Sequence, residues 1–403
     1  MAIIGIGGFG SVHTRIIEQL SASGEIRCVA FAEMNMEKWK KEYETLTALG
    51  AIHYEDYKEM LAKHPEIEFV VIATPIALHK PMSIYAMEQG FHVLTEKPPA
   101  VTVEDVQEMI DAQKRTGKRC AVQFQNTSGQ AFRQAVQLLK EGAIGEVRKV
   151  TGIGMWKRTD EYYERTPWAG KLKHQGEYVL DGTLHNPFAH LVYNCMIAAG
   201  SGDVMQAVPD VVQAELYRGH RIESEDTACV RATMQGGVQL HIYTTLCHTE
   251  NAVPSIEVEG SDGRMHWYYN NRLVVTDRSG HEREYRYEPL VTPELMPNMY
   301  RNLIEAIRDP EVQLLAPIGG SLHYLMLTNG AFESSGIIRD IPEEYMERKP
   351  EGNTIATYIR DCENWIKQAA KEGKLFSEMG WGETAAPFAL KNYKRFTWGE
   401  RLT

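Results

Sequence analysis

The chain has 403 residues, 43% of them hydrophobic, and its 43 basic and 54 acidic residues give a formal net charge of −11. A single hydrophobic core stops growing near roughly 250 to 300 residues, so this length predicts two domains. The charges form no basic stripe that could neutralise a phosphate backbone, which argues against a nucleic-acid partner. No apolar run approaches the ~20 residues that span a bilayer, and no signal peptide opens the chain. We therefore expect a cytoplasmic protein without a membrane anchor.

The cysteines lie far apart in the sequence, and no two of them form a C-x-x-C pair. Several fall inside apolar, strand-like runs, where a thiol behaves as a small hydrophobic side chain. We expect all six to be reduced core residues: Cys28, Cys120, Cys195, Cys229, Cys247 and Cys362.

Residues 2 to 121 alternate short apolar runs with amphipathic helical stretches, as in "AIIGIG", "VHTRIIEQL", "IRCVAFAE", "FVVIAT" and "RCAVQFQ". Regular alternation of this kind is typical of a doubly wound parallel sheet. We predict an α/β Rossmann domain over residues 1–122.

The pattern changes after about residue 145 to runs such as "VRKVTGIGMW", "TACVRATM" and "VQLHIYTTL", joined by "QGG", "SDG" and "NN". Short connections rich in Gly and Asn indicate β-hairpins. We predict an α+β domain with an open antiparallel sheet over 123–343, and a helical extension packing on the body over 344–403. A sheet with one uncovered face favours self-association, so we expect a homodimer or homotetramer.

Gly5, Gly7 and Gly10 form a G-x-G-x-x-G turn between a predicted strand and a predicted helix. This is where a dinucleotide pyrophosphate needs bare backbone and a helix N-terminus, and Gly8 and Phe9 lie inside the same turn. Glu33 ends the next predicted strand, at a spacing that suits a carboxylate on the adenosine ribose. We expect NAD rather than NADP, because Glu33 would repel a 2′-phosphate. Alternatively, Glu33 is a solvated residue after a strand.

Two further segments, "IATPIALH" (72–79) and "GFHVLTEKPPAVT" (90–102), each end a predicted strand. With the glycine turn they resemble the Gfo/Idh/MocA family of glucose-fructose oxidoreductases and inositol dehydrogenases. The resemblance continues through "LLKEGAIGEVRKV" and "SIEVEGSDGR". It implies cofactor-groove positions and a cis peptide before Pro98. The implied cofactor contacts are Thr74, Pro75, His79, Glu96 and Lys97, and we add Gln125 after the next strand. The alternatives are a turn lysine at 97 and a capping or packed histidine at 79.

The segment "VLDGTLHNPFAH" (179–190) places Asp181 four residues before His185. In the family, a helix opens with this Asp-x-x-x-His spacing and both side chains point at the nicotinamide. On a helix the carboxylate could orient the imidazole, or both could hold adjacent sugar hydroxyls. Pro187 instead suits the first position of a helix with Asn186 as N-cap, which would start the helix after His185.

A metal site is the weaker interpretation of this segment, because Asp181, His185 and His190 lack the spacing of a familiar three-ligand set. We expect no metal. His190 lies in an almost wholly apolar predicted helix, so we expect a core histidine.

The preceding segment, "WKRTDEYYERTPWAGKLKHQGEY", is dense in aromatic and basic residues. Aromatic faces with nearby cations suit a carbohydrate ring and its hydroxyls or carboxylate. The candidate substrate contacts are Tyr162, Tyr163, Arg165, Trp168 and Lys171. An aromatic-rich loop packed under the sheet would have the same composition.

Together these features indicate an NAD-dependent oxidoreductase acting on a secondary hydroxyl of a sugar, cyclic polyol or sugar derivative. The expected catalytic residues are Lys97, Asp181 and His185, with His185 as the base. An ordinary histidine pKa near 6.5 would make turnover rise with pH through that region. The alternatives are an NAD-dependent glycoside hydrolase that oxidises its sugar transiently, with Tyr163 as acid or base, and a non-catalytic NAD-binding regulator.

Overall fold

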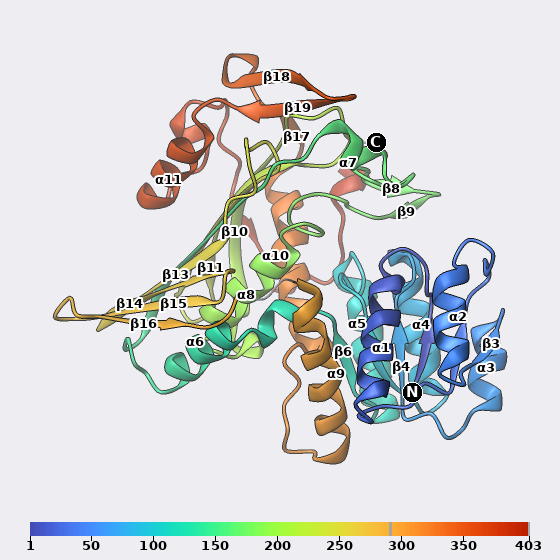
Figure 1. Cartoon of the computed structure of the whole chain (residues 1–403). Coiled ribbons are helices and arrows are strands. Elements are labelled where there is room, and N and C mark those ends of the chain that lie inside the picture. Colours follow the sequence, from blue (N-terminus) through green and yellow to red (C-terminus); the bar gives the residue numbers. More distant parts are fainter. Residues whose placement is uncertain (290–291, 402–403) are drawn as a thin grey trace. The chain divides into compact units, whose positions relative to one another are not determined.

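The computed structural model describes residues 1–289 and 292–401, and the chain divides into two compact units (Figure 1). The first unit comprises Met1–Ala100, Asp105–Ser128 and Val291–Ser321. The second comprises Val101–Glu104, Gly129–Leu290 and Leu322–Thr403. The main change of unit, at residue 128, lies near the boundary expected at 122. The segment Val291–Ser321 also belongs to the first unit, although the sequence pattern assigned it to the second domain.

The first unit contains a six-stranded parallel sheet in the order β3-β2-β1-β4-β5-β6. This order reverses beside β1, as in doubly wound dinucleotide-binding folds, and confirms the predicted Rossmann architecture. The central strands are buried throughout because helices cover both faces of the sheet. The strands are β1 (Ala2–Ile4), β2 (Ala30–Ala32), β3 (Ile52–Tyr54), β4 (Phe69–Ile72), β5 (His92–Thr95) and β6 (Cys120–Val122).

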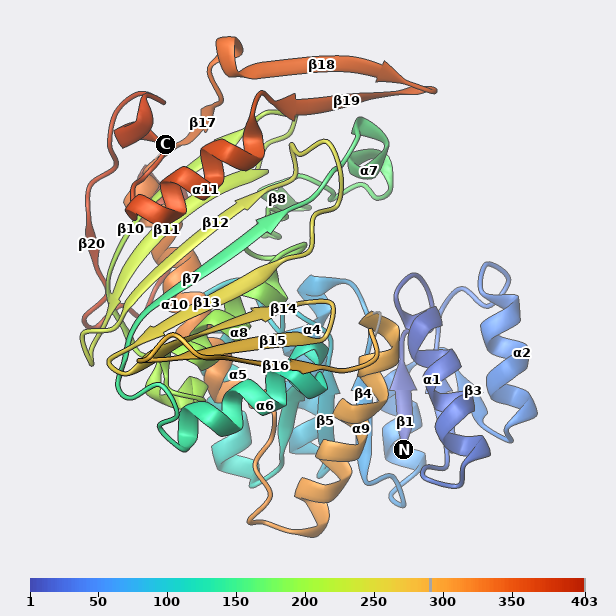
Figure 2. The ribbon, with the colours of Figure 1, turned by 60° about the vertical axis from the view of Figure 1, so that its left-hand side comes forward.

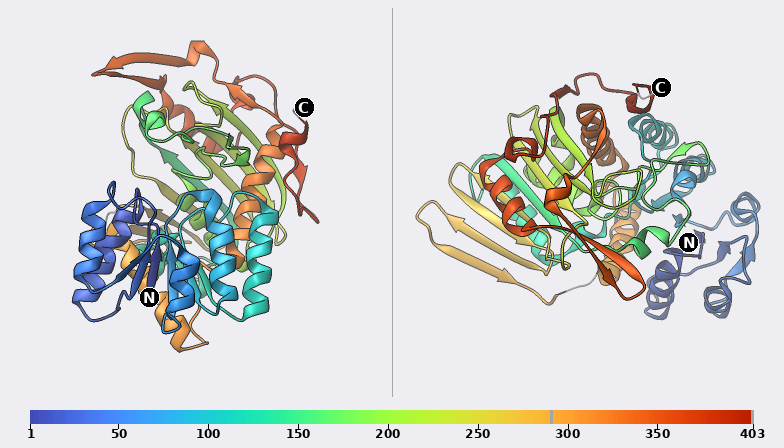
Figure 3. Two further views of the ribbon diagram at one scale, coloured as in Figure 1. Left: turned by 90° about the vertical axis from the view of Figure 1, so that its right-hand side faces the viewer. Right: turned by 90° about the horizontal axis from the view of Figure 1, so that it is seen from above.

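Helices flank this sheet on both sides, as the left view of Figure 3 shows. They are α1 (Gly10–Ala22), α2 (Lys40–Ala48), α3 (Tyr57–Lys63), α4 (Ile76–Glu88), α5 (Val103–Thr116), the 3₁₀ turn η1 (Gln125–Ser128) and α9 (Thr292–Arg308). Helix α9 follows the second unit's sheet in sequence but is built into the first unit. Its Tyr300 hydroxyl lies 2.6 Å from Nδ1 of His13 on α1. A long-range contact of this kind leaves no local signal in the sequence.

Within the described residues the second unit has a ten-stranded sheet in the order β16-β15-β14-β13-β7-β12-β11-β10-β17, with β20 paired to β10. Most neighbours are antiparallel, as predicted, but β7–β12 and β10–β17 are parallel. The strands are β7 (Val147–Met155), β10 (Pro209–Arg218), β11 (Thr227–Met234), β12 (Gln239–Thr245), β13 (Ser255–Gly260), β14 (Gly263–Tyr268), β15 (Arg272–Asp277), β16 (Glu282–Arg286), β17 (Ile338–Asp340) and β20 (Phe388–Ala389).

Helix α8 (Ala189–Ala199) is buried along its whole length and packs on strand β7. Gly152 and Gly154 of β7 make this close approach possible, since a Cβ there would lie 2.5 Å from Cys195 Sγ and from Phe188 Cε1 respectively. The remaining helical segments of this unit are α6 (Gln130–Lys140), α7 (Asp160–Glu164), η2 (Val204–Gln206), α10 (Ile318–Ser335), η3 (Glu343–Tyr345), α11 (Cys362–Glu372), η4 (Ser377–Met379) and η5 (Trp398–Arg401).

The C-terminal extension is only partly helical, in contrast to the prediction. It begins with a hairpin of β18 (Met346–Glu351) and β19 (Thr354–Ile359), followed by α11 and an irregular tail (Figure 2). A second small hairpin, β8 (Lys173–His174) with β9 (Glu177–Tyr178), lies earlier in the chain. Helix α11 contacts β7 and β12. Its cluster with Phe376 and Trp381 therefore covers part of the sheet face expected to be open.

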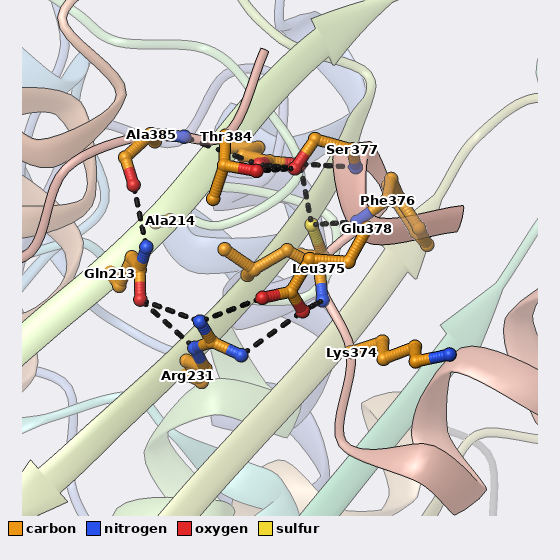
Figure 4. A network of polar contacts seen from close by, with 12 residues as sticks. Gln213, Ala214, Arg231, Lys374, Leu375, Phe376, Ser377, Glu378, Thr384 and Ala385 are labelled. Atoms are coloured by element: carbon orange, nitrogen blue, oxygen red, sulfur yellow. Dashed lines mark hydrogen bonds and ion pairs between the residues drawn. The ribbon is translucent and has the colours of Figure 1, made fainter. Parts of the chain in front are cut away.

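Polar contacts fasten the tail to β10 and β11 (Figure 4). Arg231 of β11 donates to Gln213 Oε1 at 2.8 Å and to Glu378 Oε1 at 3.0 Å. Buried Glu215 accepts hydrogen bonds from the backbone N–H and hydroxyl of Ser377, at 2.9 and 2.5 Å. A buried carboxylate without donors would be costly, so these bonds help to specify where the tail lies.

All six cysteines are buried and unpaired with one another, as expected. Among the described helices, none is both long enough and apolar enough to cross a lipid bilayer.

Candidate active site

The glycine turn lies at the carboxyl end of β1 and opens helix α1. Gly5 has a φ of 84°, and a Cβ at Gly10 would lie 2.5 Å from the Gly5 carbonyl oxygen. A Cβ at Gly7 would lie 2.3 Å from the indole ring of Trp39. Gly5 and Gly10 therefore require glycine, whereas a Cβ at Gly7 would displace the half-buried Trp39 ring. All three present bare backbone at a helix N-terminus, where a pyrophosphate binds. Phe9, in the same turn, is 46% exposed.

Glu33 lies one residue beyond β2, beside this turn. Its Oε2 accepts a hydrogen bond from the Ile6 N–H at 3.2 Å, and its Oε1 accepts one from Asn35 at 2.9 Å. The carboxylate is therefore fixed next to the glycine backbone, the position from which an acidic residue reaches a ribose hydroxyl in this fold.

His79 joins two loops at the same edge of the sheet. Its Nδ1 lies 2.8 Å from the Pro98 carbonyl and its Nε2 lies 2.7 Å from the Thr74 carbonyl. Burial lowers the pKa of this imidazole, while the two carbonyls oppose that shift. The Lys97–Pro98 peptide bond is cis, which confirms what the family resemblance implied. His79 thus holds the two loops together, and Pro75 occupies the N-cap position of α4 between them.

Glu96 belongs to a buried chain of hydrogen bonds. Its Oε1 lies 2.7 Å from His13 Nε2, and His13 Nδ1 in turn lies 2.6 Å from the Tyr300 hydroxyl. Its Oε2 accepts a hydrogen bond from the Lys97 N–H at 3.1 Å. These contacts set the orientation of the Glu96–Lys97 pair from helices α1 and α9.

Several buried polar atoms near the carboxyl ends of β4, β5 and β6 have no hydrogen-bond partner within the described part of the chain. They are Thr74 Oγ1, Thr95 Oγ1, Gln125 Oε1 and both amide atoms of Gln123. Buried polar groups are normally paired, so unpaired ones along one edge indicate a ligand that supplies the missing partners. The bare turn, the fixed carboxylate and these atoms together fit a dinucleotide such as NAD.

In the second unit, residues 183–188 form turns, and α8 begins at Ala189 with Phe188 in the N-cap position. The shared helical face considered for Asp181 and His185 is therefore absent, and Asn186 is not the N-cap. The Asn186 side chain instead donates to Asp181 Oδ1 at 2.6 Å. The opposite oxygen, Oδ2, accepts from the Gly170 N–H at 2.7 Å and lies 3.4 Å from Arg165.

His185 lies in the core of the second unit, 1% exposed, and its ring packs against Tyr324 and Phe332. Its Nε2 lies 3.1 Å from the Thr328 hydroxyl, whereas Nδ1 has no partner among the described residues. Burial lowers the pKa of His185 to about 3. The expectation of an ordinary His185 pKa near 6.5 was therefore wrong, because a ring removed from water resists protonation. His185 is neutral at physiological pH, with one unpaired nitrogen.

Glu225 holds the segment between Asp181 and His185 in place. Its Oε1 accepts a hydrogen bond from Leu184 N–H at 3.2 Å, and Ser224 donates to Oε2 at 2.7 Å. From α10, the Tyr324 hydroxyl donates to the Leu184 carbonyl at 2.7 Å. Burial raises the pKa of Glu225 to about 7, and nearby Asp181 acts in the same direction. Both sides of the Leu184 peptide are thus held by buried groups.

A cavity of about 460 Å³ lies beside α7 in the second unit. Among the predicted substrate contacts, Tyr163 and Lys171 line it, together with Asp160, Glu164, Arg221 and Glu223. Arg165 and Trp168 are not in this lining. The Arg165 guanidinium instead lies 3.7 Å from the centre of the Tyr162 ring and 5.4 Å from that of Trp168. Asp181 contacts Gly170 of the cavity lining and Arg165, so it links the two groups.

Among the described residues, one group has ligand atoms close enough to hold a metal ion: His220, Asp226 and Cys247. It shares no residue with Asp181, His185 and His190, for which a metal site was the weaker interpretation. His220 Nδ1 lies 2.8 Å from Asp226 Oδ2, and Asp226 also accepts from the N–H groups of Gly219 and His220. These protein donors satisfy the Asp226 carboxylate. The His220 ring also packs against Tyr163, and the two ring centres lie 4.9 Å apart.

Comparison with known proteins places this arrangement in a family. Residues 1–124 match the oxidoreductase family with an NAD-binding Rossmann fold (GFO_IDH_MocA), and residues 132–266 match the GFO/IDH/MocA C-terminal domain. The two matches together span more than half of the chain. The protein belongs to the GFO/IDH/MocA oxidoreductase family, and its first domain is an NAD-binding Rossmann fold.

Particular relatives resemble parts of the chain. An uncharacterized oxidoreductase, ORF334 of Rhizobium meliloti, is 36% identical over 36% of this chain and 42% of its own length. A glycosyl hydrolase family 109 protein of Porphyromonas gingivalis is 32% identical over 43% of this chain and 39% of its own length. The chain therefore matches less than half the length of either relative.

A solved structure resembles the fold more completely. The WlbA dehydrogenase from Bordetella pertussis, in complex with NADH and UDP-GlcNAcA, superposes with a TM-score of 0.66. It is 24% identical, and the match covers 83% of this chain and 95% of that one. At this identity the likeness concerns the fold.

Sequence reasoning missed the groups that hold the candidate residues in place, including His13, Trp39, Glu225, Tyr300 and Thr328. His13 alone had a local signal, since it follows the glycine turn by three residues on the predicted helix. The others are ordinary in their own segments, and only the fold of each unit brings them beside a candidate residue.

Proposed function

We propose that the protein is an NAD-dependent dehydrogenase that oxidises a secondary hydroxyl of a sugar, cyclic polyol or sugar derivative. The observation that carries this proposal is the dinucleotide cradle of the first unit, where Gly5, Gly7, Gly10 and Glu33 meet at one edge of the sheet. When bound, NAD supplies the hydride acceptor. The family match supports the cofactor, and the sugar-nucleotide ligand of the WlbA structure is consistent with a carbohydrate substrate.

We assign the substrate chemistry to Lys97, Asp181 and His185. Lys97 carries a cation at the end of β5, and Glu96 beside it is oriented by His13. We propose that His185 accepts the hydroxyl proton at Nδ1, which has no partner among the described residues. Because burial lowers the pKa of His185 to about 3, this transfer requires a bound substrate that makes the ring more basic. Asp181, held by Asn186 and Gly170, positions the turn and the neighbouring Arg165 cation. Tyr163 and Lys171 contact the substrate from the cavity.

The test is a turnover assay of purified protein with NAD and a panel of probes: D-glucose, N-acetyl-D-glucosamine, myo-inositol, D-glucuronate and aryl glycosides. We expect stoichiometric NADH from at least one of them. His185→Ala should lower turnover by roughly 10² to 10⁴ with little change in NAD affinity, as for a positioned base. Lys97→Ala should weaken both turnover and substrate binding. Tight NAD binding without turnover of any probe would favour a non-catalytic regulator instead.

A second candidate function is NAD-dependent glycoside hydrolysis, because one relative is named a glycosyl hydrolase family 109 protein. Tyr163 lines the cavity, but burial raises the pKa of this phenol well above its ordinary value, which makes it a weak proton donor and disfavours it as the acid. The same assay separates the two functions. Aglycone release with catalytic NAD and no net NADH supports the hydrolase, whereas NADH without aglycone release supports the dehydrogenase.

We also propose that the protein acts in the cytoplasm as a homodimer or homotetramer. The sheet face beside α11 retains a hollow of about 1090 Å³ lined by β7, β13 and β14, so this part of the sheet is left uncovered, as a surface for self-association requires. Light scattering of the purified chain tests this, and a monomer at micromolar concentration would contradict it.

A further inference from the structure

The β18–β19 hairpin contacts one wall of the cavity through helix α7. Thr354 Oγ1 accepts a hydrogen bond from the Glu161 N–H at 3.1 Å, which satisfies a free donor in the first turn of α7. Ala356 forms a β-bridge with Thr159, the residue before that helix. Figure 2 shows the hairpin running alongside α7. The position of Tyr163, which lies on α7 and faces the cavity, therefore depends on this hairpin.

The same hairpin contacts Gly219, which lies two residues before the cavity-lining residues 221–223. Arg348 of β18 donates to the Gly219 carbonyl at 3.2 Å. Met346 and Thr357 pack so closely on Gly219 that a Cβ there would lie 2.7 Å from Met346 Cε and 3.4 Å from Thr357 Cγ2. Asp226 holds the Gly219 and His220 N–H groups from below. Gly219 thus lies between the hairpin and the buried carboxylate of Asp226.

The hairpin lies outside both family models, the second of which ends at residue 266. It also adds no strand to the ten-stranded sheet, since β18 and β19 pair only with each other among the named strands. Its contacts with α7 and Gly219 therefore do not arise from pairing with the main sheet. A hairpin outside the main sheet can adjust a pocket without changing the cofactor domain.

We propose that the β18–β19 hairpin is a substrate-specificity element that fixes the width of the cavity by holding α7 and residues 219–223 together. The inference rests on the proposed function, in which this cavity receives part of a carbohydrate. The polar lining of Asp160, Glu164, Lys171, Arg221 and Glu223 suits hydroxyl groups and substituents on a sugar ring. A fixed spacing between the walls selects among sugars by the size of their substituents.

The experiment compares D-glucose with N-acetyl-D-glucosamine as substrates of the full-length protein. The test variants are Arg348→Met, Thr354→Val and their combination, which remove the two hydrogen bonds to the walls. Lys349→Met is the matched control, because it removes a neighbouring cation of β18 that forms an ion pair with Glu347 of the same strand. Lys171→Met and Tyr163→Phe test the cavity itself.

We expect the double variant to change the ratio of kcat/KM for the two sugars by about fivefold through KM, with kcat and NAD affinity within about twofold of the parent. Lys349→Met should leave the ratio unchanged. If the cavity variants alter KM but the hairpin variants do not, the hairpin proposal is wrong and the function stands. If neither set alters KM, the cavity is not the substrate site and the hairpin proposal falls with it. If no sugar is turned over, the proposed function fails first.

Discussion

The carboxylate of Glu225 lies directly against the backbone of Gly182, so that a Cβ at position 182 would lie 2.0 Å from Glu225 Oε2. Gly182 follows Asp181 and begins the turn that contains His185. Glu225, in the loop before β11, thus leaves no room for a side chain at position 182, between the proposed catalytic residues Asp181 and His185.

Gly182→Ala should be destabilising, because the added methyl group must displace a buried, hydrogen-bonded carboxylate. Overpacking of this kind costs about 1 to 3 kcal/mol of unfolding free energy. Urea unfolding measures it, with Gly236→Ala as the control, since a Cβ at Gly236 meets nothing within 4 Å. Equal stability of the two variants would show that the turn relaxes without cost.

Glu225→Gln should change how stability depends on pH. Burial raises the pKa of Glu225 to about 7 from its ordinary value of 4.5. The folded state therefore holds a proton that the unfolded state has released between these values. Stability from this group is present below about pH 4.5 and is lost as pH rises through about 7, by on the order of 3 kcal/mol.

The glutamine variant carries no titrating proton, so its stability relative to the parent should improve between pH 5 and pH 8. Urea unfolding at both pH values measures this change. Glu177→Gln, at an exposed position of β9, should show no such trend. A parallel pH response of parent and Glu225→Gln would mean that Glu225 ionises normally in the folded protein.

Cofactor choice should depend on Glu33. A carboxylate held by Ile6 and Asn35 beside the glycine turn would face the 2′-phosphate of NADP as a like charge. At ~4 Å and an effective dielectric near 20, unit charges interact by about 4 kcal/mol, an upper guide that solvent reduces. We expect at least about tenfold tighter binding of NAD, a difference of about 1.4 kcal/mol.

Calorimetric dissociation constants for the two cofactors test this preference. Glu33→Gln should narrow the difference, and Glu37→Gln, an exposed acid of the same loop, should not. Equal affinities for NAD and NADP in the parent protein would show that Glu33 does not face the ribose.

Trp381→Ala should cost about 3 to 5 kcal/mol of unfolding free energy, the usual cost of removing a large buried aromatic side chain. Trp381 is 2% exposed, and its ring lies 4.9 Å from Phe376 and 5.2 Å from Tyr217. Thermal and urea unfolding measure the loss. Ile355→Ala, at a position 44% exposed on the hairpin, is the control. A loss below about 1 kcal/mol would mean that the tail contributes little to the second unit's core.

The sequence by itself determined the parallel-sheet domain and its dinucleotide turn. Strong local signals carry both: runs such as "FVVI" are apolar on both faces of a strand, and close backbone contacts require glycine at positions 5 and 10. The hairpin signals "QGG", "SDG" and "NN" were equally local, and β11–β12, β13–β14 and β14–β15 pair as expected.

Tertiary structure decided what the candidate residues can do. The spacing of Asp181 and His185 suggested a shared helical face, but Asn186 and Gly170 bind the aspartate while Thr328 and two aromatic rings enclose the histidine. A pKa depends on the solvent and charges around a group, so burial could lower that of His185 to about 3 without any mark in the neighbouring sequence. The return of α9 to the first unit and the contacts of the β18–β19 hairpin have the same cause: they join residues far apart in the chain, whose proximity local patterns do not encode.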